Sequence, residues 1–296
     1  MKICYKETKF KEKSLYLIEM ANDIVNEYKE QGYELTLRQL YYQFVARDII
    51  PNNQKSYDNL GALISNARLA GLIDWRAIED RTRNIRNAFH WEDPNELLLS
   101  AANQFDLNKW ACQREYVEVW VEKDALVGIV GQAAERYDVP YFSCRGYVSQ
   151  TEMWGAAQRI MRKLDEHEHA TIIHLGDHDP SGKDMTRDIR ERINMFASHD
   201  GYDEFNIEIR RVALEMGQIQ KYNPPPNPAK LTDSRCGRYI EQYGRSSWEL
   251  DALEPMVLEN IITTAVEDCL NIPLFNQMQE KEAEIKRKLK RYAENF

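Results

Sequence analysis

The sequence of 296 residues predicts an α/β protein, in which an N-terminal helical, winged-helix-like domain precedes a Rossmann-like domain with a mainly parallel sheet. Two observations predict this fold class. Helical stripes of apolar residues follow one another in the first third of the chain, and from residue 115 onward β-rich runs alternate with helical segments joined by short loops. We expect the helical domain to cover 1–95, a connection 96–114, and the α/β domain with a helical C-terminal extension 115–296.

Composition and charge are those of an ordinary globular protein. The chain is 43% hydrophobic and 29% charged, and no run approaches the roughly 18 apolar residues of a membrane span. Residues 1–14 lack the apolar stretch of a signal peptide, so we expect a cytoplasmic protein without a membrane partner. Five cysteines without a CxxC pair argue against a disulfide framework and a structural zinc. The net charge of −9 argues weakly against nucleic acid, although it can hide local basic patches.

The first two predicted helices cover 14–29 and the segment after Thr36, which is a good helix N-cap. In the second helix, Tyr41 lies on the apolar stripe and faces the core. Arg38 and Tyr42 are four residues apart on a neighbouring, more polar face, so we expect an exposed phenol with a guanidinium beside it. Such a pair is suited to attack and hold a phosphate. The alternative is that both tyrosines are half-buried aromatics of a packed helix.

A third helix, predicted over 56–69 and followed by an extended piece, completes a pattern that fits a winged-helix or helix-turn-helix DNA-binding unit. Between residues 34 and 90 the chain carries eight Arg and Lys against six Asp and Glu, so this segment is mildly basic inside an acidic chain. The candidate phosphate contacts are Arg68, Arg81, Arg83 and Arg86. A solvated charged surface explains these arginines almost equally well.

The α/β domain is predicted from an alternation of strands and helices. The expected strands are 116–121, 139–144, 171–175 and one within 205–214, and the expected helices between and after them are 125–137, 151–167 and 183–196. Because short loops connect the elements, the sheet should be largely parallel with helices on both faces.

The stretch from Thr171 to Lys183, TIIHLGDHDPSGK, carries the clearest chemical signal. A buried strand breaks at Gly176, and Asp177 and Asp179 follow at its carboxyl end, where open α/β sheets place their ligands. Two carboxylates this close repel each other unless a cation lies between them, and hard oxygen ligands suit Mg²⁺ or Mn²⁺. The stretch therefore predicts a metal site.

Glu122 also ends a predicted strand. If that strand is a neighbour of 171–175, Glu122, Asp177 and Asp179 gather at one sheet edge as three carboxylates that can hold Mg²⁺. The alternative is an Asp-rich turn with a solvated helix N-cap at Ser181.

These residues carry a resemblance to known families. A Glu at the end of one strand and Asp-x-Asp-Pro-x-Gly at the end of a later one resemble a Toprim domain, the metal-binding fold of topoisomerases, primases and certain nucleases. The matching residues are Glu122, Asp177, Asp179 and Gly182. The segment Arg38 to Tyr42 resembles the Arg-x-x-Tyr-Tyr segment of the topoisomerase VI A subunit and of its relatives that make meiotic double-strand breaks.

The order of the two motifs is more specific than either motif alone, because in that family a helical domain bearing the tyrosine precedes the Toprim domain. The resemblance covers roughly residues 35–265 and includes the late segment Trp248 to Leu253. It is closest to the short, stand-alone A-like proteins of bacterial mobile elements and phages, called Mini-A.

The resemblance implies a transesterification in which a tyrosine oxygen attacks a DNA phosphate, forms a 5′-phosphotyrosyl link and frees a 3′-hydroxyl. By position in the motif the nucleophile is Tyr42, assisted by Arg38, and Mg²⁺ or Mn²⁺ would lie at Glu122, Asp177 and Asp179. In the family the tyrosine of one subunit works with the metal site of the other. The resemblance therefore also implies a homodimer that binds double-stranded DNA and makes double-strand breaks.

Topoisomerase VI also needs an ATP-hydrolysing B subunit, and this chain has no GxxxxGK[ST] phosphate loop. A B-like ATPase would have to be a separate chain, so we expect DNA cleavage rather than complete strand passage. Two other classes stay open. A Toprim nuclease that uses metal-activated water would tolerate Tyr42→Phe and leave no protein on the DNA, and a non-catalytic DNA-binding protein of a mobile element would bind equally well in EDTA.

Overall fold

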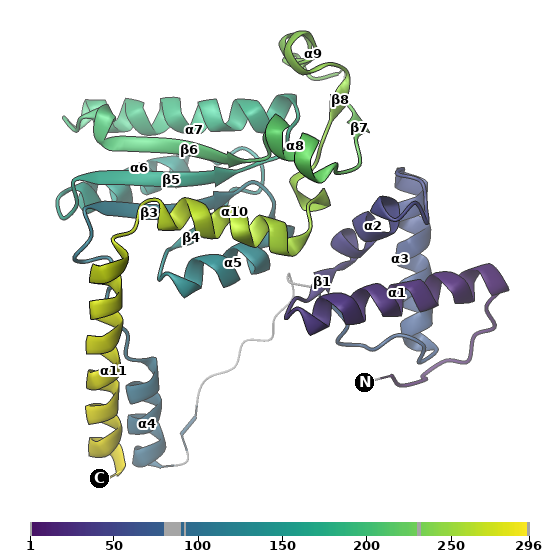
Figure 1. Cartoon of the computed structure of the whole chain (residues 1–296), viewed down its shortest axis with the longest axis horizontal. Helices are drawn as coiled ribbons and strands as arrows, with labels where there is room; N and C mark the ends of the chain where they lie inside the picture. The colour runs from purple at the N-terminus through teal and green to yellow at the C-terminus, as the bar shows by residue number, and fades with distance from the viewer. Residues whose placement is uncertain (1, 80–89, 92, 230–231, 295–296) are drawn as a thin grey trace.

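The computed structural model describes the chain except for residues 1, 80–89, 92, 230–231 and 295–296. Its N-terminal part is a helical domain, which lies at the right of Figure 1. The helices are α1 (Glu12–Glu30), α2 (Leu37–Ala46) and α3 (Gln54–Leu69). Their apolar stripes meet in one core, where Ile24, Leu40 and Phe44 are completely buried. The predicted helices of this domain are therefore present.

Helix α2 begins at the predicted cap. The Thr36 hydroxyl accepts a hydrogen bond from the Gln39 backbone N–H, and the Gln39 side chain accepts one from the Thr36 N–H, which together form a capping box. β1 (Leu35–Thr36) and β2 (Ile78–Glu79) form a short parallel pair beside the helices. Because 80–89 lie outside the described residues, the domain is established as helical, and its winged-helix character stays a prediction.

The second domain is built on a parallel sheet, as predicted. Within the described residues the sheet has the order β4-β3-β5-β6, and all its pairs are parallel. The strands are β3 (Glu115–Val121), β4 (Tyr141–Ser143), β5 (His169–Leu175) and β6 (Ile207–Ala213).

Helices cover both faces of this sheet (Figure 1). On one face, α5 (Val127–Arg136) and α10 (Pro255–Glu267) pack against Val119, Val121 and their neighbours. On the other face lie α6 (Gln150–Leu164) and α7 (Pro180–His199), whose core includes the fully buried Trp120. The near-continuous burial of β3 and β5 is what a parallel sheet covered on both faces requires.

A set of short elements after β6 returns the chain to the carboxyl edge of the sheet. They are α8 (Met216–Tyr222), β7 (Asn227–Pro228), α9 (Cys236–Tyr243), β8 (Ser246–Ser247) and the 3₁₀ turn η3 (Leu250–Ala252). The backbones of His178 and Trp248 exchange two hydrogen bonds, N to O 2.8 Å and 2.9 Å. This bridge holds residues 248–253 directly against the loop that carries the two aspartates.

Two helices form an arm that projects from the α/β domain at the lower left of Figure 1. α4 (Pro94–Gln104), which lies in the segment expected to be a connection, runs beside α11 (Ile272–Glu294). The buried Glu282 of α11 joins the arm to the segment that follows α4, because its carboxylate accepts a hydrogen bond from Leu107 N at 2.9 Å. Throughout the described chain, every helix, α11 included, is too short or too polar to cross a membrane.

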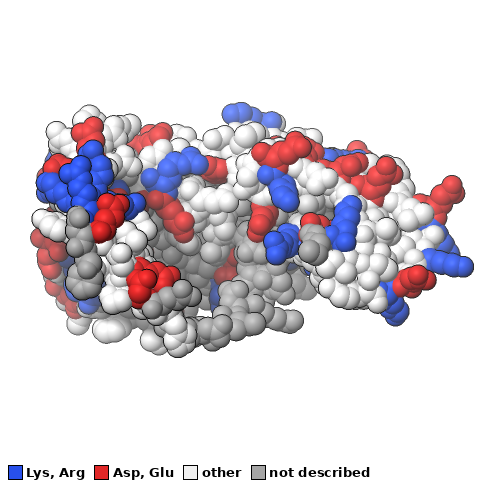
Figure 2. Space-filling model, turned by 90° about the horizontal axis from the view of Figure 1, so that it is seen from below, with Lys and Arg blue, Asp and Glu red and all other residues white. Residues whose placement is uncertain are grey.

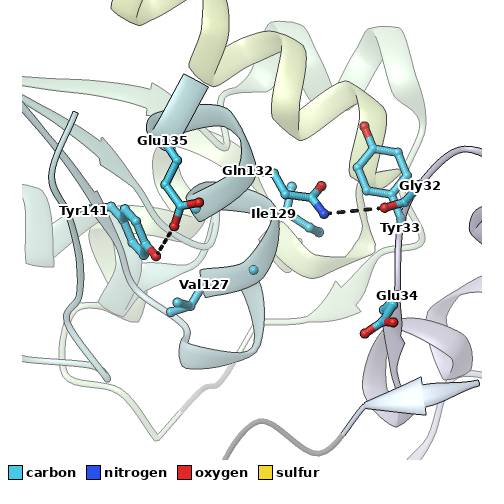
Figure 3. A pocket seen from close by; sticks show the side chains of 10 residues that line it. Gly32, Tyr33, Glu34, Val127, Ile129, Gln132, Glu135 and Tyr141 are labelled. Atoms are coloured by element: carbon cyan, nitrogen blue, oxygen red, sulfur yellow. Dashed lines mark hydrogen bonds between the residues drawn. The ribbon is translucent and has the colours of Figure 1, made fainter. Parts of the chain in front are cut away.

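The helical domain touches the α/β domain through α2 and through the loop after α1. Ala252 of η3 belongs to the apolar core of the helical domain, and the Tyr33 hydroxyl donates a hydrogen bond to Glu259 of α10. Beside this contact Gln132 of α5 donates to the Gly32 carbonyl at 3.5 Å, across a cavity of about 540 Å³ (Figure 3). The two domains are therefore in direct contact at the edge of the sheet where β3 and β5 end.

Candidate functional site

The structure brings Glu122 and the two aspartates to one edge of the sheet, as predicted. β3 and β5 are neighbours with Val121 opposite Leu175, so the residues that follow both strands emerge together. The Glu122 N–H donates to the Leu175 carbonyl at 2.8 Å, and a Glu122 carboxylate oxygen accepts from the Asp177 N–H at 2.8 Å. The condition that the two strands are neighbours is therefore met.

Two glycines allow this close approach. A Cβ at Gly176 would lie 2.9 Å from a Glu122 carboxylate oxygen, and a Cβ at Gly182 would lie 2.2 Å from the Asp177 carbonyl oxygen. The buried guanidinium of Arg211 holds the loop by donating hydrogen bonds to the carbonyls of Gly176, Asp177 and Gly182 at 2.7–2.9 Å. The loop of the Asp-x-Asp motif is thus held at both ends by packing and by hydrogen bonds to its backbone.

Each of the three carboxylates has one oxygen oriented by a backbone N–H. Glu122 accepts from Asp177, Asp177 accepts from Leu250 at 2.8 Å, and Asp179 accepts from Gly182 at 2.6 Å. All three side chains are buried, and burial raises the pKa of both Glu122 and Asp177 above their ordinary values. A nearby cation would favour the charged form of these carboxyls and so offset the rise in their pKa.

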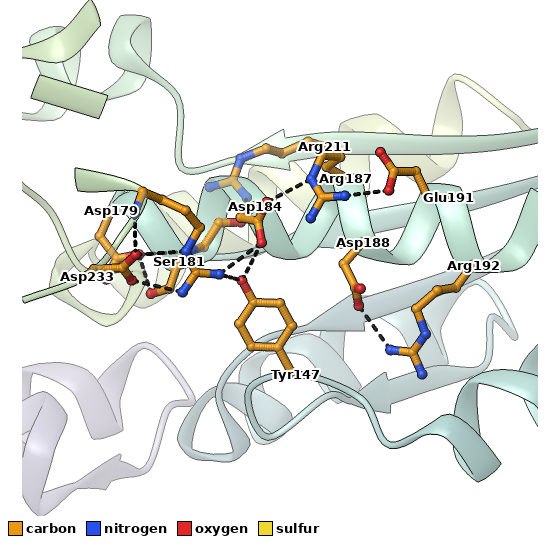
Figure 4. Close-up of polar contacts among 12 residues, drawn as sticks. Tyr147, Asp179, Ser181, Asp184, Arg187, Asp188, Glu191, Arg192, Arg211 and Asp233 are labelled. Atoms are coloured by element: carbon orange, nitrogen blue, oxygen red, sulfur yellow. Dashed lines mark hydrogen bonds and ion pairs between the residues drawn. The ribbon is translucent and has the colours of Figure 1, made fainter. Parts of the chain in front are cut away.

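Asp179 also begins a helix. It is the N-cap of α7, and its carboxylate accepts hydrogen bonds from Gly182 N–H and from the Ser181 hydroxyl, the latter at 2.8 Å (Figure 4). The alternative of a cap at Ser181 is therefore corrected, because Pro180 is the first residue of the helix and Asp179 precedes it. The capping role and a role as metal ligand use different oxygens and are compatible.

Lys123, which the sequence did not single out, places a positive charge among the carboxylates of the site. Its ammonium group lies 2.9 Å from Asp177 Oδ2, 2.8 Å from Glu249 Oε2 and 2.9 Å from Asp251 Oδ1. Burial alone would lower the pKa of Lys123, but the surrounding carboxylates outweigh it and raise the pKa above its ordinary value. The ammonium group therefore remains charged among three carboxylates.

Among the described residues, no group of three His, Cys, Asp or Glu side chains is arranged to hold a metal ion. The donor set nevertheless suits a hard divalent cation, since it consists of carboxylates whose other oxygens are oriented by backbone N–H groups. Asp177 uses its second oxygen to bind Lys123 in the present arrangement. A metal at Glu122, Asp177 and Asp179 would have to share or replace that contact.

Tyr42 differs from the expectation. It is only 4% exposed, so the prediction of an exposed phenol is wrong, and Tyr41 is equally buried with its hydroxyl bonded to Asn52 at 3.0 Å. Tyr42 is covered because it lies in the apolar core of the helical domain, to which Ala252 of η3, more than two hundred residues further along the chain, also belongs. Burial first, then the nearby Asp251 and Glu249 charges, raise the pKa of Tyr42 above its ordinary value.

The guanidinium expected beside Tyr42 is present. Arg38 Cζ lies 5.9 Å from the centre of the Tyr42 ring, which is a cation–π distance. Its Nε donates to Asp251 at 2.8 Å and its Nη2 to Glu249 at 2.5 Å, so two of the three carboxylates that bind Lys123 also bind Arg38. Burial would lower the pKa of Arg38, but Asp251 and Glu249 outweigh it and raise it.

A cavity of about 530 Å³ joins the two halves of the site. Arg38 and Tyr42 of the helical domain line it together with Asp177, Asp179 and Glu249 of the α/β domain. The tyrosine and the aspartates, which the sequence places 135 residues apart, thus face one cavity of a single chain.

Of the four candidate phosphate-contact arginines, only Arg68 lies within the described residues. It donates to the Ile78 carbonyl and lies 6.0 Å over the Trp75 ring, contacts that stabilise the helical domain. Arg81, Arg83 and Arg86 fall in the segment that is not described. On the face shown in Figure 2, lysines and arginines are interspersed with acidic side chains. One group of lysines and arginines gathers at the left end of this view.

Sequence reasoning missed Lys123, Glu249 and Asp251. Lys123 follows a candidate ligand directly, which was an available signal, and the other two lie in the segment 248–253 that entered only through the resemblance. No family model matches this chain, and no curated protein matches it either.

Proposed function

We propose that this protein cleaves DNA by a metal-dependent tyrosine transesterification, in the manner of the topoisomerase VI A subunit. One observation carries the proposal: Tyr42, Arg38, Asp177 and Asp179 line the same cavity between the helical domain and the carboxyl edge of the sheet. A nucleophile, a positive charge for the phosphate and carboxylates for a metal are the three components that such a reaction needs.

In the proposed reaction the Tyr42 oxygen forms a bond to a DNA phosphorus and the bond to the 3′-oxygen breaks. The phenol loses its proton and the departing 3′-oxygen gains one, so the products are a 5′-phosphotyrosyl link and a free 3′-hydroxyl. Arg38 orients the phosphate. Mg²⁺ or Mn²⁺ bound at Glu122, Asp177 and Asp179 would supply Lewis-acid stabilisation of charge on the phosphate oxygens.

The described arrangement is a resting state in this proposal. Tyr42 is buried in the cavity that Glu249 also lines, and its raised pKa makes the phenol a poor nucleophile. Entry of DNA must therefore separate the helical domain from residues 249–251 before Tyr42 can react. The resemblance implies that the tyrosine then acts with the carboxylates of a second subunit, so a homodimer and a double-strand break belong to the proposal.

The helical domain would bind the double helix in the manner of a winged-helix unit, with Arg68, Arg81, Arg83 and Arg86 as the proposed phosphate contacts. A B-like ATPase, if one takes part, would be a separate chain. DNA cleavage rather than strand passage is the activity that we assign to this chain.

The test is a covalent-adduct assay with supercoiled plasmid and Mg²⁺ or Mn²⁺, stopped with detergent. Tyr42→Phe is compared with Tyr41→Phe, which removes the same atom from the neighbouring and equally buried ring. We expect protein-linked linear DNA with the wild type and with Tyr41→Phe, and none with Tyr42→Phe. Adducts that persist in Tyr42→Phe would contradict the assignment of the nucleophile.

The burial and raised pKa of Tyr42 favour a second candidate, a Toprim nuclease that hydrolyses DNA with metal-activated water. This reading predicts free linear DNA from both wild type and Tyr42→Phe. The position of Lys123 among the carboxylates favours a third, a non-catalytic DNA-binding protein, because the chain's own ammonium then replaces the metal. Such a protein would leave the plasmid intact and bind it equally well in EDTA.

A further inference from the structure

Four charged side chains form a bridge between the two domains. Arg38 comes from α2, Lys123 from the end of β3, and Glu249 and Asp251 from the segment around η3. Glu249 Oε2 lies 2.5 Å from Arg38 Nη2 and 2.8 Å from Lys123 Nζ. Asp251 lies 2.8 Å from Arg38 Nε and 2.9 Å from Lys123 Nζ through its two different oxygens. We call this set the charged bridge.

Both carboxylates of the charged bridge contact both cations. Asp251 is completely buried, whereas 44% of the Arg38 side chain and 26% of the Glu249 side chain are exposed. Arg38 and Glu249 of the bridge are therefore accessible to solvent, whereas Asp251 is buried. Replacement of the Glu249 carboxylate by another anion would cost little free energy, because the incoming anion again leaves Arg38 charged and paired.

The bridge separates two cavities. On one side lies the cavity that Tyr42 and the aspartates line, and Arg38 and Glu249 belong to its wall. On the other side Arg38 and Lys123 line a cavity of about 310 Å³ together with Glu122 and Arg145. Arg38 faces both cavities, and the smaller one is lined by three positive side chains and by the carboxylates of Glu122 and Asp124.

A phosphodiester matches the two carboxylates chemically. Arg38 donates from Nε to Asp251 and from Nη2 to Glu249, so each of the two donors with which a guanidinium can hold two oxygens of one phosphate is occupied by a different carboxylate. Lys123 adds a point charge on the same Glu249 oxygen and on the other oxygen of Asp251. The pair therefore presents a ready anion-binding arrangement whose present anions are part of the chain.

We propose that Arg38 and Lys123 form a phosphodiester-binding site that the Glu249 and Asp251 carboxylates fill in the DNA-free protein. A DNA phosphate would replace Glu249 first, because Glu249 is the more exposed of the two. Since Glu249 lines the same cavity as Tyr42, the same exchange opens the space beside the tyrosine. This inference rests on the proposed function, and it adds Lys123 as a substrate-binding residue and Glu249 as an internal competitor of the substrate.

The experiment measures binding of a fluorescein-labelled DNA duplex by anisotropy in EDTA, so that no cleavage contributes. Glu249→Gln keeps the shape of the side chain and removes the competing charge. Its control is Glu168→Gln, which removes a carboxylate from the ion pair with Arg114 on a distant exposed surface and changes the net charge equally. We expect Glu249→Gln to bind about tenfold more tightly than wild type, and Glu168→Gln to differ by less than about twofold.

A second variant shows whether the gain depends on the proposed cations. In the double variant Glu249→Gln/Arg38→Gln the gain should disappear. A Glu249→Gln protein that binds DNA no better than Glu168→Gln would overturn the inference, and so would a gain that survives in the double variant. Thermal unfolding of each variant confirms that the compared proteins are folded.

The inference and the proposed function fail in different ways. If the wild type forms adducts through Tyr42 but Glu249→Gln shows no gain in affinity, only the inference is wrong. If Glu249→Gln binds more tightly but adducts never form, the phosphate site stands and the transesterase does not. Absence of DNA binding by every variant would remove both.

Discussion

Lys123 Nζ lies 2.9 Å from Asp177 Oδ2. Lys123 follows the end of β3 and Asp177 follows the end of β5, so the ammonium group balances the charge of the aspartate across the two strand ends. This contact joins two neighbouring strands at their carboxyl ends. It also makes Lys123 the centre of a group of three carboxylates, since Glu249 and the buried Asp251 bind the same ammonium.

Replacing Lys123 by Met should therefore destabilise the protein strongly. The variant leaves Asp177 buried without its cation and Asp251 with Arg38 alone, and breaking a buried pair by removal of one partner costs about 3–5 kcal/mol. Urea denaturation measures the change in the free energy of unfolding.

The control is Lys288→Met, which breaks an i,i+4 pair with Glu284 whose side chains are 63% and 58% exposed. That change should cost no more than about 0.5 kcal/mol. Equal effects of the two substitutions would show that Lys123 does not stabilise the carboxylate group.

Asp179→Asn should separate the capping role of this residue from metal binding. Asn is as good an N-cap as Asp, so the hydrogen bond to Gly182 N–H is retained and α7 should stay intact. The loss of a carboxylate charge should lower the affinity for Mn²⁺ by about tenfold or more, measured by titration calorimetry.

Asp233→Asn is the matched control, because Asp233 also accepts a backbone hydrogen bond, from Arg235 at 2.9 Å, and pairs with the Arg235 side chain. Its Mn²⁺ affinity should equal that of the wild type. Unchanged Mn²⁺ binding in Asp179→Asn would exclude Asp179 as a ligand.

Gly182→Ala should destabilise the protein because a methyl group has no room there. The new Cβ would lie 2.2 Å from the Asp177 carbonyl oxygen, and backbone must move to relieve the overlap. We expect a loss of about 2–3 kcal/mol in the free energy of unfolding, which is typical of overpacking.

Gly155→Ala provides the comparison, since nothing lies within 4 Å of a Cβ at this position in the middle of α6. Alanine is the better helix former, so this variant should be more stable by about 0.5–1 kcal/mol. A loss of stability at Gly182 together with a gain at Gly155 would show that the effect at Gly182 comes from the contact with Asp177.

Local patterns predicted much of the fold. The Thr36 cap, the alternation of strands and helices, and the ends of β3 and β5 depend on residues close together in the chain, and the structure has each of them. The gathering of Glu122 and Asp177 followed from one further rule, that neighbouring parallel strands end at the same edge.

The features that the sequence did not predict depend on partners far along the chain. Helical periodicity gave Tyr42 a polar face, but Glu249 and Ala252 cover that face from the other domain. Likewise α4 was expected in a connection, and it lies beside α11 because the two helices are brought together by the return of the chain after α10. A periodicity describes which face a helix can bury, and not which segment will cover it.

The arm should lose stability in acid through Glu282. Its carboxylate binds Lys109 Nζ at 2.8 Å, Lys286 Nζ at 3.1 Å and the Leu107 N–H at 2.9 Å. Burial alone would raise the pKa of Glu282, but these donors lower it from 4.5 to about 2. Because the folded pKa lies below the unfolded one, the contribution to stability is complete above about pH 4.5 and is lost as the pH falls toward 2.

Glu282→Gln tests this sign, since glutamine has similar shape and no charge to titrate. At neutral pH the wild type should be more stable by about 1–3 kcal/mol, and the difference should shrink between pH 4.5 and 2 until the two proteins unfold alike. Thermal unfolding followed across this range measures the difference. A wild type that keeps its advantage at pH 2, or that never has one at pH 7, would show that the bonds of Glu282 to Lys109 and to the Leu107 N–H do not hold α11 to the segment after α4.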